Sequence, residues 1–136
     1  MAEAGKPGYG TVGWLDITVP EAGKLSDFYA RVAGWRVEPV DMGGYQDFCM
    51  LGAGGSAVAG ICHSRGANRD FPPVWLPYIT VPDLDASLAK CAEGGGTVQS
   101  PPRSAGAYGR FAVIRDPVGA FIALLEPPAA PAQGPA

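Results

Sequence analysis

The chain is poor in charged residues and has no apolar run long enough to cross a bilayer. Only 17% of its 136 residues are charged, and the formal net charge is −3. Nucleic-acid-binding proteins usually carry a basic face, so this composition disfavours a nucleic-acid partner. The longest apolar stretch, residues 120–125, is far shorter than the roughly 18 residues of a membrane-spanning helix. We therefore expect neither a nucleic-acid nor a membrane partner.

Cysteine and histidine are also scarce. The three cysteines, Cys49, Cys62 and Cys91, are an odd number without a Cys-x-x-Cys motif, and His63 is the single histidine. This usage disfavours a disulfide framework and favours reduced thiols. The N-terminus lacks the charged-then-apolar pattern of a signal segment. We expect a cytoplasmic protein.

Glycine and proline, in contrast, are abundant, with 20 and 14 residues. Many of them lie at the ends of the chain, which predicts disordered tails over residues 1–10 and 127–136. By length alone the rest is one domain, large enough to bury a core.

A four-residue sequence occurs twice and indicates an internal duplication. Ile-Thr-Val-Pro stands at residues 17–20 and again at 79–82, an offset of 62, and an acid follows each copy. Phe-Cys-Met-Leu at 48–51 is echoed by Phe-Ala-Val-Ile at 111–114, an offset of 63. We predict two modules, 11–63 and 74–126, joined by a linker over 64–73.

Apolar periodicity and turn residues predict the same element order in both modules. Each reads as strand, helix and three strands, which gives an α+β fold of two tandem βαβββ modules. The helices would cover one sheet face and leave the other free to form a cleft. In the first helix we expect Ala22, Leu25, Phe28, Tyr29 and Val32 to point inward. The predicted strands are 11–19, 35–40, 45–51, 57–62, 74–81, 97–99, 110–115 and 120–125, and the predicted helices are 21–33 and 84–93.

Several motifs in this order resemble the vicinal oxygen chelate superfamily of glyoxalases, bleomycin resistance proteins and extradiol dioxygenases. They are Asp27-Phe28-Tyr29 before Gly34-Trp35, the segment 81–85 (Val-Pro-Asp-Leu-Asp), and Asp116-Pro117-x-Gly119. The resemblance implies a curved-sheet cleft that binds a small molecule, and a homodimer. Clefts within one chain and across two chains both occur in this superfamily.

The resemblance also implies four metal-ligand positions, which here carry Trp14, Gly60, Leu76 and Ala123. None of these side chains can bind a divalent cation, which needs several converging N, O or S donors. We therefore expect no metal and no other cofactor. Metal-dependent dioxygenase chemistry is disfavoured.

Strand alternation predicts which side chains line the cleft. They form a mostly apolar wall with a few polar groups, which is typical of a small-molecule pocket and suits a flat or cationic ligand. Glycine and alanine at 60 and 123 would leave room beside the larger rings. Alternatively, the same side chains fill a core between the modules. The predicted set is Trp14, Asp16, Thr18, Val58, Gly60, Cys62, Leu76, Tyr78, Thr80, Phe121, Ala123 and Leu125.

Three residues carry further hypotheses. Asp16 is costly to bury without a partner, and it could pair with a neighbour such as Tyr78, contact a ligand or act as a general base. Cys62 is expected to be an inert thiol, because no base lies on its side of the strand. Arg110 follows the flexible loop 106–109, and it could grip a ligand carboxylate or simply be solvated.

Three functional hypotheses follow. The first is a glyoxalase/bleomycin-resistance-like protein that binds a small, partly aromatic molecule without metal. The second is a metal-independent lyase or isomerase in which Asp16 abstracts a proton. The third is a non-catalytic interaction module with a closed cleft.

Overall fold

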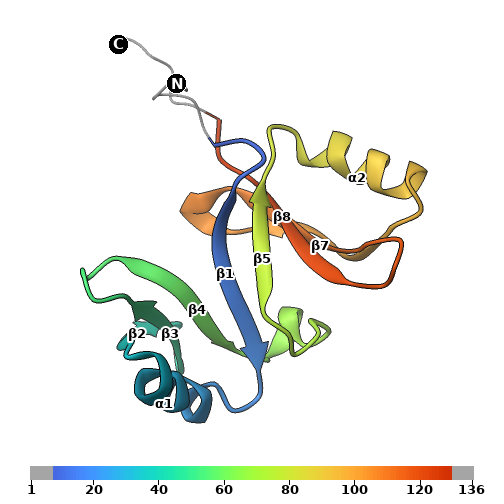
Figure 1. The fold of residues 1–136 in the computed structure, drawn as a ribbon. Helices are drawn as coiled ribbons and strands as arrows, with labels where there is room; N and C mark the ends of the chain where they lie inside the picture. Colours follow the sequence, from blue (N-terminus) through green and yellow to red (C-terminus); the bar gives the residue numbers. More distant parts are fainter. Residues whose placement is uncertain (1–7, 130–136) are drawn as a thin grey trace. The chain divides into compact units, whose positions relative to one another are not determined.

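The computed structural model describes residues 8–129 and places two modules of the same design along the chain (Figure 1). The first module consists of β1 (Val12–Val19), α1 (Ala22–Ala33), β2 (Arg36–Asp41), β3 (Gln46–Leu51) and β4 (Ala57–His63). The second consists of β5 (Leu76–Thr80), α2 (Leu84–Glu93), β6 (Thr97–Ser104), β7 (Arg110–Arg115) and β8 (Phe121–Glu126). Single turns of 3₁₀-helix span Gly66–Asn68 and Gly106–Tyr108. The predicted α+β class and element order are confirmed.

The chain divides into two compact units, and their boundaries fall inside β1 and β5. The N-terminal unit is Trp14–Pro77, and the C-terminal unit combines the described residues up to Gly13 with those from Tyr78 onward. Backbone hydrogen bonds explain this: Gly10 N–H donates to Thr80 O at 2.7 Å, and Thr80 N–H donates to Thr11 O at 2.9 Å. The predicted module bounds, with a linker over residues 64–73, stay a prediction. Most of the two predicted tails lies outside the described residues.

Both units have the same sheet topology. In the N-terminal unit the strand order is β2-β3-β4-β1, with β1 parallel to β4. In the C-terminal unit it is β6-β7-β8-β5, with β5 parallel to β8. The remaining neighbours within each unit are antiparallel.

The strand register confirms the duplication position by position. Asp16 lies opposite Gly60, and Tyr78 lies opposite Ala123. Two residues further on, Thr18 lies opposite Cys62, and Thr80 lies opposite Leu125. The Ile-Thr-Val-Pro copies therefore occupy equivalent places in the two sheets.

One part of the predicted repeat is shifted by a residue. Phe48 lies opposite Ile61 of β4. The counterpart of Ile61 in β8 is Leu124, and it lies opposite Ala112 rather than Phe111. A one-residue shift moves a side chain to the other sheet face, so Phe48 and Phe111 face opposite ways. The predicted match of Phe48 with Phe111 is wrong, and Asp47 is the counterpart of Phe111.

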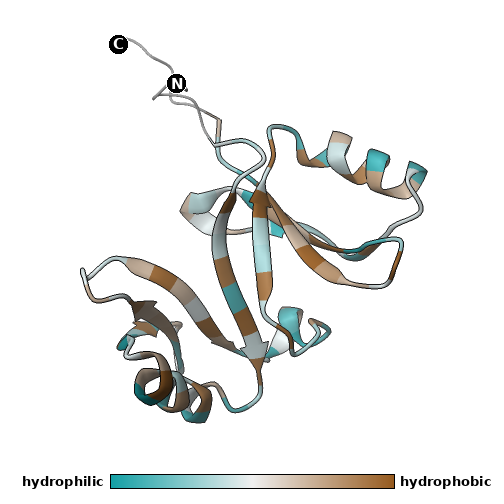
Figure 2. Ribbon diagram, viewed as in Figure 1, coloured by the Kyte–Doolittle hydropathy of each residue, from teal (hydrophilic) through white to brown (hydrophobic). Residues whose placement is uncertain are grey.

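The N-terminal core lies between α1 and its sheet. Ile17, Met50, Ala59 and Ile61 are buried there together with Ala22 of the helix. The hydropathy colouring of Figure 2 shows β1 alternating between apolar and polar residues, as a sheet with one packed face requires. Leu15 and Val19 of β1 pack against this core together with the buried Ile17.

An aromatic cluster packs against the same core. The Tyr29 ring meets the Trp75 ring edge-on at 5.2 Å between centroids, and it lies 5.9 Å from the Trp35 ring. Trp75 Nε1–H also donates a hydrogen bond to the Tyr29 hydroxyl at 3.2 Å. The residues just before β5 are thereby tied to α1.

Two residues of α1 that were expected to point inward are exposed instead. Phe28 is 52% exposed and Val32 is 65% exposed. The buried face of the helix is centred on Ala22 and Ser26, which are 0% and 2% exposed. With 3.6 residues per turn, positions 28 and 32 lie on the far side of the helix from Ser26. The prediction is wrong for these two residues.

The C-terminal core is built in the same way, from Leu84 of α2 with Ala112 and Leu124 of the sheet. Strand β6 is longer than the predicted 97–99 and runs through Pro101 and Pro102. Within its unit β6 is an edge strand, where proline is tolerated, and its register against β7 shifts on either side of Ser100. Among the described residues no helix is long and apolar enough to span a membrane.

Candidate functional site

The side of the N-terminal sheet that α1 does not cover is called here the N-terminal helix-free face. Strand alternation and register place every second residue of β1, β3 and β4 on this face. This brings together five predicted site residues, and it adds two that the sequence did not indicate. The members are Trp14, Asp16, Thr18, Asp47, Cys49, Gly60 and Cys62.

Trp14 reaches across to β4 and occupies the space above Gly60. A Cβ atom on Gly60 would lie 3.2 Å from Trp14 Cζ2 and 3.3 Å from Asp16 Cβ. The missing side chain at position 60 therefore accommodates the indole instead of leaving the predicted free space. Trp14 as a whole residue is half-buried.

Asp47 is a buried acid that sequence reasoning missed. It is 9% exposed, and its Oδ1 accepts a hydrogen bond from His63 N–H at 2.8 Å. The His63 Nδ1 lies 3.4 Å from the same oxygen and 2.8 Å from Gln46 O. Since a carbonyl only accepts, Nδ1 carries a hydrogen in this contact. The available signal was an acid inside a predicted strand, directly before the apolar run of residues 48–51.

Cys62 is a protonated thiol at neutral pH. Its burial raises its pKa well above the ordinary value, and the negative charges of Asp16 and Asp47 and a hydrogen bond to Asp47 add to this. The thiolate is the nucleophilic form of cysteine, so this environment favours the inert role. The effect of Asp16 on the Cys62 pKa also shows that its carboxylate lies near the thiol.

The equivalent face of the C-terminal sheet is aromatic and apolar. The Tyr78 and Phe111 rings lie 5.7 Å apart, and Val113 and Ala123 are fully buried. At the start of β8 the Arg115 guanidinium lies 5.7 Å from the Phe121 ring centroid. The predicted residues found on this face are Tyr78, Thr80, Phe121, Ala123 and Leu125.

Arg110 and Arg103 lie on opposite faces of the C-terminal sheet. Arg110 Nη2 is 3.0 Å from Asp85 Oδ2 in α2 and 3.1 Å from Glu126 Oε1, so its guanidinium is on the helix side. The proposed grip of Arg110 on a ligand carboxylate stays a prediction. Arg103 lies opposite Phe111 and donates to Ser100 Oγ at 2.9 Å, on the helix-free side. Pro101 and Pro102 made the Arg103 segment look like a loop in the sequence.

The other two predicted residues have different surroundings. Val58, at the start of β4, is 40% exposed. Leu76 is 1% exposed and belongs by contacts to the N-terminal unit, although it opens the second module.

The donor chemistry does not fit the divalent ion that the fold family implies. In the N-terminal unit the two ligand positions carry Trp14 and Gly60, and the indole lies against the glycine. Among residues 8–129 no group of three or more His, Cys, Asp and Glu side chains is arranged to hold a metal. That the protein works without a metal stays a prediction.

The paired βαβββ units and their helix-free faces define a member of the glyoxalase-type fold class. Residues 11–124 match the family described as the Glyoxalase/Bleomycin resistance protein/Dioxygenase superfamily, and the chain belongs to this family. The resemblance found in the sequence is thus confirmed.

Two relatives give the family context. The Mycobacterium tuberculosis protein named "Putative glyoxylase CFP32" is 37% identical over 120 residues, which are 86% of this chain and 46% of the relative. The anthracycline biosynthesis protein DnrV of Streptomyces peucetius is 28% identical over 127 residues, 85% of this chain and 46% of the relative. The chain therefore spans about half the length of these curated relatives.

Solved structures support the fold. A Streptomyces coelicolor methylmalonyl-CoA epimerase variant in complex with 2-nitronate-propionyl-CoA matches with a TM-score of 0.55 and 16% identity, over 90% of this chain and 99% of that one. A hypothetical protein from Bacillus halodurans matches with a TM-score of 0.57 and 13% identity, over 90% and 98%. At these identities the likeness concerns the fold alone.

Proposed function

We propose that the protein binds a small, flat aromatic molecule on the N-terminal helix-free face, without a metal. The observation that carries the proposal is the half-buried Trp14 indole beside the Asp16 carboxylate, with Thr18 next along the strand. An indole provides a stacking surface, and a neighbouring acid and hydroxyl can fix the orientation of a polar substituent. A cationic group on the ligand would be favoured by the two acids of this face.

The name of one relative is in keeping with this ligand class. DnrV is named for anthracycline biosynthesis, and anthracyclines are flat fused-ring compounds that carry an amino sugar. Such a molecule combines a large aromatic surface with a cation, which are the two properties that Trp14 and Asp16 select.

A metal-independent lyase or isomerase is the second candidate. The Asp16 carboxylate lies near the Cys62 thiol, among half-buried and buried side chains of the face. A carboxylate in such surroundings can act as a general base toward a ligand held on Trp14. The name of the mycobacterial relative, a glyoxylase, points to the same reaction class.

Calorimetric titration with an anthracycline such as daunorubicin tests the binding proposal. We expect saturable binding with a dissociation constant on the order of micromolar, weakened at least tenfold in Trp14→Ala. Trp35→Phe is the matched control, because Trp35 packs in the aromatic cluster on the helix side and should leave binding unchanged. Equal weakening in both variants, or no binding by the folded wild-type protein, would refute the proposal.

The Asp16→Asn variant separates binding from catalysis. For a binding protein it should weaken a cationic ligand and leave a neutral ring analogue unaffected. For an isomerase or glyoxalase-type lyase, turnover of a hemithioacetal should be lost in Asp16→Asn while the wild-type rate survives a chelator. No turnover of a substrate panel by the wild type would exclude the second candidate for that panel.

A further inference from the structure

One row of side chains crosses the C-terminal sheet on the face that α2 does not cover, and every strand of this sheet contributes one residue. Arg103 of β6 lies opposite Phe111 of β7, which lies opposite Leu125 of β8. Leu125 in turn lies opposite Thr80 of β5. These residues are called the C-terminal row, and each of them is half-buried. Neighbouring strands are about 4.8 Å apart, so the row is about 14 Å long.

The neighbouring row along the strands forms a packed floor for this one. Its members are Ser100, Val113, Ala123 and Tyr78, and each is at most 6% exposed. The Tyr78 ring lies 5.7 Å from the Phe111 ring. Ser100 Oγ accepts a hydrogen bond from Arg103 Nη2 at 2.9 Å. Because these contacts hold the ring and the guanidinium of the C-terminal row in place, a ligand would cost little additional side-chain entropy on binding.

The face that carries the C-terminal row is positively charged. Among the described residues of β5–β8 that alternate onto it, none is an aspartate or glutamate, whereas Arg103 and Arg115 are cations. Glu126 lies on the other face, where it holds Arg110. A guanidinium has five N–H donors in a planar fork that matches a carboxylate, so Arg103 can bind a carboxylate while one N–H donates to Ser100. The charge and the donor geometry therefore select a planar anion.

We propose that the C-terminal row binds a small aromatic carboxylate. The Arg103 guanidinium binds the carboxylate group, and the ring system lies against Phe111 and Leu125. Aromatic rings pack offset or edge-on, so Phe111 favours a flat ring over an aliphatic chain of the same size. The length of the row, about 14 Å, accommodates two fused rings between the guanidinium and Thr80. This ligand is opposite in charge to the one proposed for the N-terminal helix-free face, and neither proposal depends on the other.

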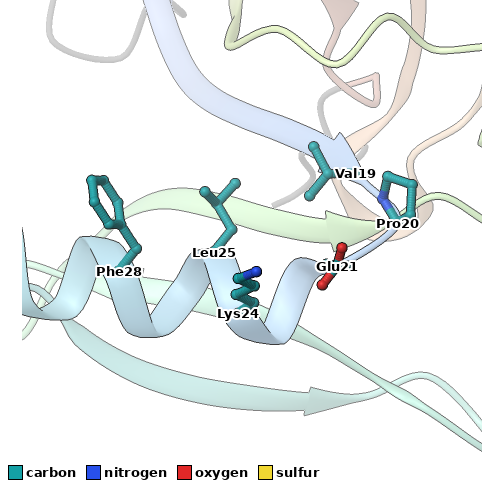
Figure 3. Close-up of a pocket in the computed structure, with 6 residues that line it drawn as sticks. All are labelled: Val19, Pro20, Glu21, Lys24, Leu25 and Phe28. Atoms are coloured by element: carbon teal, nitrogen blue, oxygen red, sulfur yellow. The ribbon is translucent and has the colours of Figure 1, made fainter.

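The hollow beside α1 is a competing place for an apolar anion (Figure 3). It has a volume of about 430 Å³, and its lining is mainly apolar. Its charged groups are Glu21 and Lys24, which are both exposed. A carboxylate placed there would be attracted by Lys24 and repelled by Glu21, so the hollow selects anions less well than the C-terminal row does. Lys24 therefore provides the matched control for Arg103.

An NMR titration with naphthoate tests the proposal, and the uncharged naphthalenemethanol is the comparison ligand. We expect saturable binding of naphthoate with a Kd on the order of 100 µM, and at least tenfold weaker binding of the alcohol. Arg103→Gln should lower the naphthoate affinity to that of the alcohol and leave the affinity for the alcohol unchanged. Arg103→Lys keeps the charge but loses the planar fork, so its naphthoate affinity should fall in between. Lys24→Gln removes the same charge and should bind both ligands as the wild type does.

The alcohol also reports on the ring contacts. Phe111→Leu should weaken both ligands several-fold, because it removes the aromatic surface and keeps an apolar side chain. Unchanged alcohol binding in Arg103→Gln would show that the variant is folded and that its loss of naphthoate affinity comes from the missing charge.

Several outcomes would overturn the proposal. They are no saturable naphthoate binding by the wild type, or unchanged naphthoate affinity in Arg103→Gln. Parallel loss of both ligands in Arg103→Gln and Arg103→Lys would show that Arg103 only supports the fold. Loss of naphthoate in Lys24→Gln would assign the anion to the hollow beside α1, and loss in Arg110→Gln alone would assign it to Arg110. The titration uses an anionic probe and Arg103, so its failure is distinct from a failure of the daunorubicin titration with Trp14→Ala.

Discussion

The two units share topology and strand register, but their helix-free faces carry different chemistry. Asp47 of the N-terminal unit corresponds to Phe111 of the C-terminal unit, and Asp16 corresponds to Tyr78. One face is therefore acidic with two thiols, and the other is aromatic. The helix-facing positions remain apolar in both units, because the burial of this face stabilises each fold. The side chains of the helix-free faces differ between the two units, although several of them, such as Val113 and Ala123, are also buried.

The two helices also begin differently. Asp83 caps α2 by accepting a hydrogen bond from Ala86 N–H at 3.0 Å, and Glu126 Oε1 accepts from Leu84 N–H at 2.8 Å. At the start of α1 Glu21 makes no side-chain capping bond. The first turn of α2 therefore depends on acids, whereas α1 depends on the packing of Ala22 and Ser26.

Among equivalent positions of the two units, we expect Met50 and Ile114 to differ most in the stability that is lost when the side chain is truncated to alanine. Met50 is 0% exposed, and its counterpart Ile114 is only partly buried. Met50→Ala should lower the free energy of unfolding by about 2–5 kcal/mol, because it leaves a cavity in a closed core. Ile114→Ala should lower the free energy of unfolding by clearly less, because Ile114 is only partly buried. Urea denaturation of both variants measures the difference, and equal losses would contradict the burial difference.

Removal of the two helix-start acids should have unequal effects. Asp83→Ala should lower the free energy of unfolding by about 1 kcal/mol, since the Ala86 N–H loses its capping acceptor. Glu21→Ala, measured at low protein concentration, should change it by less than about 0.5 kcal/mol. A thermal melt of each variant at neutral pH provides the comparison. Similar losses in both would show that the capping contrast has no energetic consequence.

The smallest expected effect is on the loss of stability at acid pH. Glu126 has its pKa lowered, first by the hydrogen bond from Leu84 N–H and then by Arg110. A carboxyl group with a lowered folded-state pKa adds stability above its unfolded pKa, near 4.3, and this is lost as the pH falls through the folded value. Glu126→Gln should therefore flatten the decline of stability below about pH 4. Glu21 at the start of α1 makes no side-chain capping bond, so we expect no comparable pH dependence from the helix start of the N-terminal unit. An unchanged pH profile would argue against the Glu126 contact in solution.

Much of the fold could be predicted from the sequence. The bounds of α2 and β7 agree with the prediction, and the Ile-Thr-Val-Pro copies occupy equivalent strands. These features depend on local signals, namely apolar periodicity, turn glycines and repeated residues. The match of Phe48 with Phe111 failed because a similar apolar run fits a strand in either of two registers. Only the pairing with β4 and β8 shows which face each ring takes.

The make-up of the N-terminal helix-free face could be predicted in part from the same local signals. Alternation along β1 and β4 correctly grouped Trp14, Asp16, Thr18, Gly60 and Cys62 on one face. It could not show that Trp14 fills the space at Gly60, because that is a contact between strands. Asp47 and Arg103 were missed, and Arg110 was chosen for its neighbouring loop.

By itself the sequence determined the duplicated βαβββ order, the family and the polarity of each strand position, because these follow from short-range patterns of burial. The tertiary structure decided which charged groups meet. It paired Arg110 with Asp85 and Glu126, tied Asp47 to His63, and turned Phe28 away from the core. Those outcomes depend on strand register and helix rotation. Both are set by the packing of segments far apart in the chain, which no local pattern encodes.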